Sequence, residues 1–233
     1  MIPGNPAVAR YYQSWIKEIQ NRNNQLSITY ATSYVLFDRK LNYIKYDLAM
    51  QKHYEDLLFA LPTTEKITLL AHSVGSYFAL RLLNKYPEKI EKVIIMFPYI
   101  GYSTIKSLKI VGIPYVIDRL FPLAELVSWT KNVFQKWDEH VAHISNTELT
   151  ACLRFGVRQC VYFNKHKFDT QTISPSNREK IHFLYTKNDR WCPEQSIDLL
   201  KQVSHSKETE IRHDFITDIN SRARMIDELM LVL

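Results

Sequence analysis

The residues with the clearest chemical signature surround Ser73, where residues 71–75 read Ala-His-Ser-Val-Gly. This is a variant of the G-x-S-x-G elbow, in which small residues two places before and after a serine permit a sharp turn that exposes the hydroxyl. The apolar run of residues 67–71 predicts a buried strand before the serine, and the helix-forming residues that end before Pro87 predict a helix after it. This context favours a nucleophilic Ser73; the alternative is a serine that caps a helix in a tight turn.

A serine hydroxyl is a poor nucleophile until a base removes its proton, and that base needs a carboxylate to orient it. In a parallel sheet such groups collect in the loops after the carboxyl ends of the strands. Asp189 follows an apolar run that ends at Thr186, and His213 ends a short predicted strand over residues 208–213. The order Ser73, Asp189, His213 is the nucleophile, acid, base order of the α/β-hydrolases.

Each partner of the serine has alternatives. Asp189 could instead cap the helix predicted to begin near Pro193, because a loop aspartate after a strand often has that role. His205 is the reserve base. Asp214 is a weaker acid candidate, since adjacent residues at a strand end point in different directions, and Asp198 is an outside candidate because it falls in a predicted helix.

Acyl transfer to a serine also requires hydrogen-bond donors for the developing oxyanion. The backbone N–H of Val74 is one donor by position, directly after the serine. The second is expected from a glycine-containing loop after an early strand, and Pro3-Gly4-Asn5-Pro6 fits that description. Because proline has no N–H, we expect the Asn5 backbone N–H to be the second donor.

Apolar runs and helical periodicities alternate along the chain, which predicts a parallel sheet covered by helices on both faces. The expected strands are residues 28–35, 67–71, 90–97, 180–186 and 208–213, and the expected helices are residues 11–19, 48–61, 76–86, 193–203 and 215–231. Asp47 is the expected cap of the second helix. The last helix should bury Ile216, Ile219, Met225, Ile226 and Leu229.

The alternation breaks between Tyr99 and Ser174, so the domain organisation we expect is a core over residues 1–98, a helical cap insertion over 99–174, and the rest of the core over 175–233. Residues 105–129 of the insertion are rich in apolar side chains and carry few charges. They form either a cap helix packed on the core or a surface that lies in a lipid interface.

Composition excludes several classes of protein. The chain has 233 residues, 46% hydrophobic and 23% charged, which is ordinary for a globular domain. Its net charge of +6 is dispersed, which argues against a nucleic-acid surface, and its 3 cysteines form no close pair, which argues against a zinc site. No secretory signal and no apolar run of membrane-spanning length is visible. We therefore expect no metal, no cofactor and at most peripheral membrane attachment.

With these pieces in place, the chain resembles the lipid droplet-associated hydrolase family. The matching elements are Ile-Pro-Gly-Asn-Pro at residues 2–6 with Tyr-Tyr and an aromatic helix after it, Gln-Lys-His at 51–53, Ala-His-Ser-Val-Gly-Ser-Tyr at 71–77, Trp-Cys-Pro at 191–193 behind Asp189, and Phe215 shortly after His213. The similarity extends from Ile2 to the final helix. No single motif is specific, but the combination is.

The resemblance implies an α/β-hydrolase fold, the triad Ser73, Asp189 and His213, and hydrolysis of lipid or sterol esters at lipid droplets and the cytosolic face of the endoplasmic reticulum. It also implies that residues 105–129 contact the droplet. Two departures stand out: Ala71 replaces the elbow glycine, and Met1-Ile2 is too short for the strand that should precede Pro3-Gly4, so the first strands of the sheet are expected to be missing.

The leading hypothesis is therefore a serine esterase or lipase that acts on hydrophobic esters at a lipid surface. The alternative is a protein that uses a hydrolase fold to bind or cluster lipid droplets, with little or no turnover. A third hypothesis is a soluble hydrolase of small esters or thioesters, in which residues 105–129 line an acyl pocket.

Overall fold

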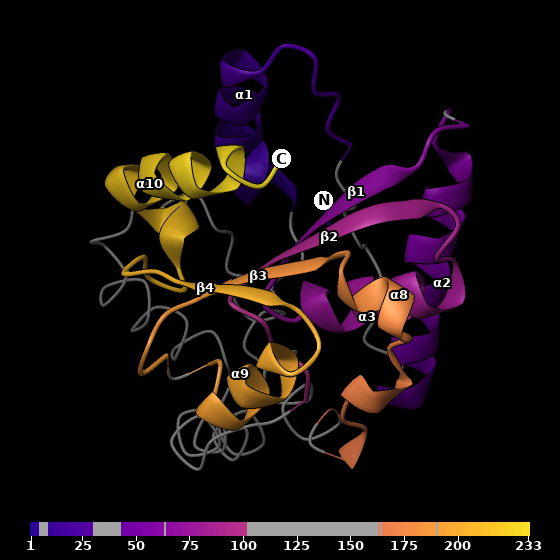
Figure 1. Cartoon of the computed structure of the whole chain (residues 1–233). Helices are drawn as coiled ribbons and strands as arrows, with labels where there is room; N and C mark the ends of the chain where they lie inside the picture. Colours follow the sequence, from indigo (N-terminus) through magenta and orange to yellow (C-terminus); the bar gives the residue numbers. More distant parts are fainter. Residues whose placement is uncertain (5–8, 30–42, 63, 102–162, 164, 190) are drawn as a thin grey trace, which may run out of the picture.

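The computed structural model describes residues 1–4, 9–29, 43–62, 64–101, 163, 165–189 and 191–233. Within these residues the chain forms one parallel sheet of four strands, in the spatial order β1-β2-β3-β4 (Figure 1). The strands are β1 (Ile67–His72), β2 (Ile90–Met96), β3 (Ile181–Tyr185) and β4 (His205–Glu208). The helices are α1 (Gln13–Arg22), α2 (Tyr43–Ala60), α3 (Gly75–Lys85), α8 (Pro175–Arg178), α9 (Glu194–Lys201) and α10 (Ile219–Met230), with 3-10 turns η1 (Ala9–Tyr12), η3 (Thr170–Thr172) and η4 (Phe215–Thr217).

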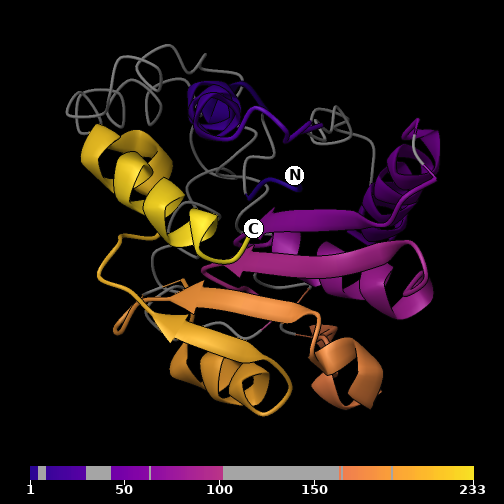
Figure 2. The same ribbon diagram turned by 45° about the horizontal axis from the view of Figure 1, so that its top comes forward.

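Helices cover both faces of the sheet, as the alternation of strands and helices predicts. Helices α1 and α10 lie on one face, and α3 and α9 lie on the other (Figures 1 and 2). Successive strand residues alternate between the two layers: Leu69 and Ala71 belong to the α3 side, whereas Leu70 belongs to the α1 side. Both faces are buried, which explains why β1, β2 and β3 read as continuous apolar runs.

The expected strand over residues 208–213 is wrong, because β4 is His205–Glu208 and His213 lies in the loop after it. All four residues of β4 are exposed and polar, and the strand pairs only with β3 at the edge of the sheet. An edge strand that is exposed on both faces has no apolar alternation by which to recognise it.

Four other expectations need correction or lie outside the described residues. Asp47 falls inside α2 instead of capping it, and Ile219 of α10 is 65% exposed, although Met225, Ile226 and Leu229 are buried as expected. The strand expected over residues 28–35 and the insertion over 99–174 fall mostly on residues that the structure does not describe, and residues 105–129 do so entirely.

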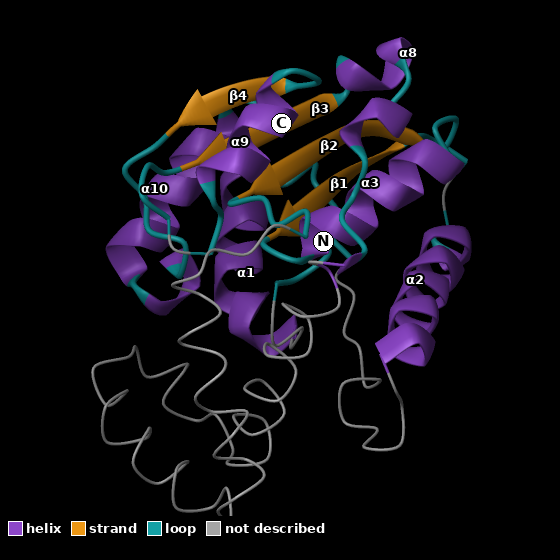
Figure 3. Cartoon of the chain, turned by 90° about the horizontal axis from the view of Figure 1, so that it is seen from below, coloured by secondary structure: helices purple, strands orange, loops and turns teal. Residues whose placement is uncertain are grey.

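The N-terminal segment pairs with the sheet through one residue, beside β1 (Figure 3). Ile2 forms a parallel bridge with Ala71 of β1, and its N–H donates to the Leu70 carbonyl at 2.7 Å. The His72 N–H returns a hydrogen bond to the Ile2 carbonyl at 3.1 Å. This single bridge, outside any regular strand, fixes Pro3-Gly4 beside the end of β1, where the site is built.

Candidate active site

The turn after β1 has the geometry of a nucleophile elbow. Ser73 has a φ angle of 50°, a strained value for a residue with a side chain, and it lies between the last strand residue and the start of α3. The Ser73 N–H donates to the Met96 carbonyl at 2.9 Å, which extends the ladder past the strand end. The N-cap of α3 is Val74 and no side chain caps it, so the Ser73 hydroxyl is not used as a helix cap.

Two glycines allow the N-terminal segment to pack against this turn. A Cβ atom on Gly75 would lie 2.5 Å from the Ile2 carbonyl oxygen and 2.9 Å from that of Pro3. A Cβ atom on Gly4 would lie 2.8 Å from His72 Nδ1 and 3.0 Å from the Ser73 Cβ. Gly75 of the elbow motif is therefore required because Ile2 and Pro3 pass directly over it. Ala71, the small residue at the other end of the motif, is a fully buried strand residue.

Replacing Gly75 with alanine should destabilise the protein and displace Ile2-Pro3. Because the clash is with backbone oxygens rather than with a flexible side chain, we expect the free energy of unfolding to fall by about 1–3 kcal/mol. Urea unfolding measures this change. Lys85→Ala on the exposed end of α3 is the control and should cost less than about 1 kcal/mol, since it removes an exposed ammonium that pairs with Glu55 and lies over the Tyr86 ring. Equal effects of the two substitutions would contradict the packing argument.

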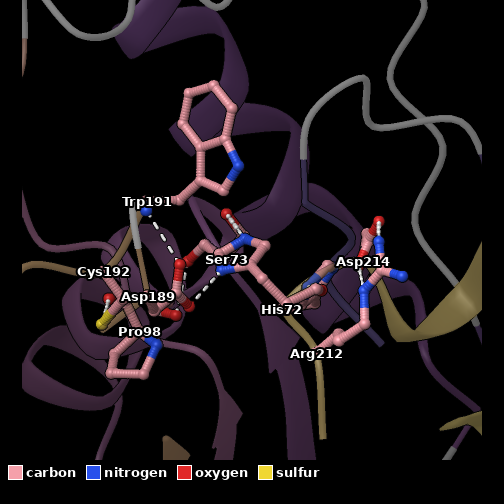
Figure 4. A network of polar contacts seen from close by, with 10 residues as sticks. His72, Ser73, Pro98, Asp189, Trp191, Cys192, Arg212 and Asp214 are labelled. Carbon is pink, nitrogen blue, oxygen red and sulfur yellow. Dashed lines mark hydrogen bonds and ion pairs between the residues drawn. The ribbon is translucent and has the colours of Figure 1, made fainter. Parts of the chain in front are cut away.

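The structure brings together the three residues predicted as a triad, of which Ser73 and Asp189 are labelled in Figure 4. His213 Nε2 lies 3.0 Å from the Ser73 Oγ, and His213 Nδ1 lies 2.7 Å from Asp189 Oδ2. The Asp189 side chain is 1% exposed and that of His213 is 15% exposed, so the carboxylate is buried behind a ring that has some access to solvent. A carboxylate only accepts, so His213 Nδ1 carries the proton and Nε2 is free to accept one from the serine.

Asp189 is held by the loop in which it lies. Its Oδ1 accepts the Trp191 backbone N–H at 2.8 Å, and it follows Asn188, whose φ of 59° turns the chain after β3. The N-cap of α9 is Pro193, with no side-chain hydrogen bond at the cap. The alternative prediction that Asp189 caps this helix is therefore wrong.

The reserve candidates lie elsewhere. His205 begins β4 and its ring stacks on that of His182, with the ring centroids 5.0 Å apart. Asp214 accepts two hydrogen bonds from Arg212, at 2.9 and 2.7 Å, and Asp198 is an exposed residue of α9. None of these three contacts the Ser73 hydroxyl.

One of the two predicted oxyanion donors can be placed. The N–H groups of Ser73 and Gly4 are already donated, to the Met96 carbonyl and to the Tyr12 hydroxyl. Val74 stands at the N-terminus of α3, where backbone N–H groups have no partner within the helix. Asn5 lies outside the described residues.

His72 and Tyr12 are close to the triad, and the sequence analysis assigned them no role. The Tyr12 hydroxyl lies 2.6 Å from His72 Nδ1, and His72 Nε2 lies 3.0 Å from the His213 carbonyl oxygen. Two features of the sequence indicate polar groups in apolar surroundings. Tyr12 lies at the start of an aromatic helix, and His72 lies at the end of a buried strand.

Acid should destabilise the protein through His72. Burial, and secondarily the nearby His213, lowers the pKa of His72 well below its ordinary value of 6.5. Below that pH the unfolded chain binds a proton that the folded chain excludes. The free energy of unfolding should therefore fall by up to about 1.4 kcal/mol per pH unit as the pH drops from about 6.5 towards the folded pKa, with full stability above 6.5.

Urea unfolding of the wild type and of His72→Gln across this range tests the expectation. The pKa of His182 is also lowered, first by burial, so the difference between the two proteins isolates His72. A steeper loss of stability in the wild type is the expected result, and parallel curves would contradict it.

Other reactive groups near the site are inert or lack metal-binding geometry. Cys192 is buried beside the Pro98 carbonyl, and burial raises the pKa of its thiol well above the ordinary value, so the thiolate is disfavoured. Among the described residues no group of three or more His, Cys, Asp or Glu side chains is placed to hold a metal ion. No helix in that part of the chain has the length and apolar character needed to cross a membrane.

Comparison with known proteins agrees with this architecture. A solved carboxylesterase of Nitrososphaera gargenis superposes with a TM-score of 0.65 at 13% identity, over 98% of this chain and 86% of the other. A thermophilic esterase from Thermogutta terrifontis superposes with a TM-score of 0.60 at 13% identity, over 98% and 87%. At this identity the likeness shows the fold, which is that of the α/β-hydrolases, as the sequence predicts.

Relatives in sequence agree with the resemblance noted from the motifs. The human lipid droplet-associated hydrolase is 24% identical over 94% of this chain and 80% of the human protein. The family model described as lipid-droplet associated hydrolase matches residues 1–217. The chain therefore belongs to the lipid-droplet associated hydrolase family.

Proposed function

We propose that the protein is a serine hydrolase that cleaves carboxylic esters of lipids or sterols. The observation that carries the proposal is the continuous contact from the Ser73 Oγ through the His213 ring to Asp189, with distances of 3.0 and 2.7 Å, on a strained turn. Family membership supports hydrolysis as the kind of reaction.

In the proposed reaction, His213 Nε2 takes the Ser73 proton as Oγ attacks the ester carbonyl carbon. The carbonyl electrons move to oxygen, and the Val74 N–H, with the Asn5 N–H as second donor, stabilises the negative charge. When the tetrahedral intermediate collapses, His213 gives the proton to the departing alcohol, and an acyl-serine remains. Water, deprotonated by the same histidine, then releases the acid. No step requires a metal or an organic cofactor.

A lipid substrate and a lipid-droplet location are proposed from the family and from sequence. The human relative is named for its association with lipid droplets. Residues 105–129 of this chain combine many apolar side chains with few charges, as an interfacial segment does. We propose that the protein is attached peripherally to the surface of droplets and to the cytosolic face of the endoplasmic reticulum.

A fluorophosphonate probe tests the proposal directly, because it phosphonylates only a serine that a neighbouring base activates. Labelling of the folded protein, with the adduct found by peptide mapping on Ser73 and lost after heat denaturation, is the expected result. Turnover of p-nitrophenyl esters and of emulsified cholesteryl and glyceryl esters then identifies the acyl and alcohol groups. A folded protein that neither reacts nor turns over these esters would favour the alternative, a droplet-binding protein with little or no catalysis.

A further inference from the structure

A chain of three hydrogen bonds connects two loops that are far apart in the sequence. The Gly4 N–H donates to the Tyr12 hydroxyl at 3.0 Å, the Tyr12 hydroxyl lies 2.6 Å from His72 Nδ1, and His72 Nε2 lies 3.0 Å from the carbonyl oxygen of His213. Gly4 borders the loop from which the second oxyanion donor is expected, and His213 is the proposed base. The series of hydrogen bonds therefore connects the segment next to the expected oxyanion donor with the proposed base.

The backbone groups at the two ends of this series of hydrogen bonds determine the direction of every bond in it. A backbone N–H only donates, so the Tyr12 oxygen accepts from Gly4. A backbone carbonyl only accepts, so His72 Nε2 carries the ring proton and donates to His213. His72 Nδ1 is then unprotonated and accepts the Tyr12 O–H. His72 is thereby fixed as one neutral tautomer and cannot replace His213 as the base.

The surroundings of the chain are aromatic and closed to solvent. Tyr12 is 2% exposed and His72 is 4% exposed. The His72 ring meets the rings of Phe215 and Phe97 edge-on, with centroids 5.2 and 6.1 Å away, and Trp15 packs against both Tyr12 and Phe215. Hydrogen bonds in such low-dielectric surroundings are strong, and a partner left unpaired there is costly.

We infer that Tyr12 and His72 are positioning residues that couple Gly4 to the loop carrying His213, so that the backbone at both places is held in a fixed position relative to Ser73. The inference rests on the proposed function, in which these loops supply the oxyanion donor and the base. Neither side chain contacts the Ser73 hydroxyl. Tyr12 and His72 act through hydrogen bonds to the backbone of Gly4 and His213, and the His72 ring also packs against the His213 ring, with the centroids 5.2 Å apart.

The inference predicts that Tyr12→Phe affects the reaction more than substrate binding. The substitution keeps the buried ring but leaves the Gly4 N–H and His72 Nδ1 without partners. Gly4 is then freed, and the His72 ring, which donates to the His213 carbonyl, is no longer fixed on its other side. A displacement of about 1 Å in catalytic groups costs roughly 10²-fold in rate, so we expect kcat to fall about 10- to 100-fold while KM for p-nitrophenyl butyrate changes less than about twofold.

Tyr54→Phe is the matched control, because Tyr54 is also 2% exposed but packs against Phe78 on the opposite face of the sheet. It should leave both constants near the wild-type values. Equal effects of Tyr12→Phe and Tyr54→Phe, or a change confined to KM, would overturn the positioning role.

Hydrogen exchange gives a second readout that needs no activity. Tyr12→Phe breaks bonds near Gly4 and His72, yet coupling predicts faster amide exchange also in residues 209–214, at the far end of the chain of bonds. Exchange in α9, which does not contact the chain of bonds, should be unchanged. Exchange that rises everywhere, or only near Gly4, would overturn the coupling. This readout distinguishes failure of the inference from failure of the proposed function, which would show as absent labelling and turnover in the wild type.

A pair of His72 variants tests the individual bonds if Tyr12→Phe folds poorly. A glutamine amide reaches about as far as Nε2 and can still donate to the His213 carbonyl, whereas an asparagine amide reaches only about as far as Nδ1 and can still accept from Tyr12. Residues 209–214 should therefore exchange faster in His72→Asn than in His72→Gln. The reverse order would contradict the assigned bond directions.

Discussion

Ser73→Ala should abolish labelling by a fluorophosphonate and lower ester turnover by about 10⁴-fold or more, to a rate that binding and the oxyanion donors alone sustain. The substitution removes the Oγ that lies 3.0 Å from His213 Nε2. It keeps the Cβ and hence the same backbone preferences at a φ of 50°. Turnover of p-nitrophenyl butyrate and in-gel fluorescence of the probe measure the loss.

The folded state should survive this change, so the loss can be assigned to chemistry. We expect the circular dichroism spectrum and the midpoint of urea unfolding to stay close to wild type. Ser196→Ala is a control that removes the hydroxyl of a fully buried serine in α9, and it should leave labelling intact. Labelling that persists in Ser73→Ala would show that another nucleophile reacts and that the proposed site is wrong.

Strands β1, β2 and β3 could be predicted from sequence because both of their faces are buried. In β1, β2 and β3 nearly every residue contacts one of the two helical layers, so the apolar run itself marks the strand. The same principle explains why β4 was not recognised: its four residues are exposed and polar, the strand is held by backbone pairing with β3, and Lys207 reaches α10 through a surface ion pair with Glu228. The sequence therefore indicated a strand near residue 208 but placed it too late in the chain.

Predictions based on neighbouring residues missed contacts that a residue makes with a distant segment of the sequence. Asp47 has the residue type of a helix cap, yet it lies within α2 and receives two hydrogen bonds from Arg81, at 3.1 and 2.8 Å. Ile2 is too close to the N-terminus to show any periodicity, yet it forms a bridge with Ala71. Neither contact could be predicted from neighbouring residues, because each depends on a segment at least thirty positions away.

The residues of the candidate triad could be proposed from the sequence, but the residues that hold them in position could not. Ser73 is marked by its own turn, and the chain order then limits the choice of acid and base. His213 was chosen as the end of a strand, and the structure instead brings it to Ser73 in a loop beside the buried Phe215, whose ring meets that of His72. The contacts of Tyr12 and His72 join positions 60 residues apart, for which a single sequence carries no pattern.

Asp189→Asn should lower kcat by about 10⁴-fold while the site keeps its shape, because the substitution changes the proton rather than the geometry. The asparagine oxygen can still accept the Trp191 N–H, and its amide group then faces His213 Nδ1. An amide N–H only donates, so Nδ1 must accept and the ring proton moves to Nε2. In that tautomer Nε2 cannot take the Ser73 proton, and the serine loses its base.

The matched control is Asp198→Asn, which makes the same chemical change on an exposed residue of α9 and should leave kcat near the wild-type value. Asp214→Asn tests the neighbouring carboxylate, which pairs with Arg212 and should affect kcat less than tenfold, as expected for a surface ion pair. A large loss of kcat in Asp214→Asn, with near-normal kcat in Asp189→Asn, would identify Asp214 as the acid of the triad in place of Asp189. Because Asp189 is buried at 2.7 Å from Nδ1 and Asp214 already pairs with a guanidinium, we expect Asp189→Asn to show the loss.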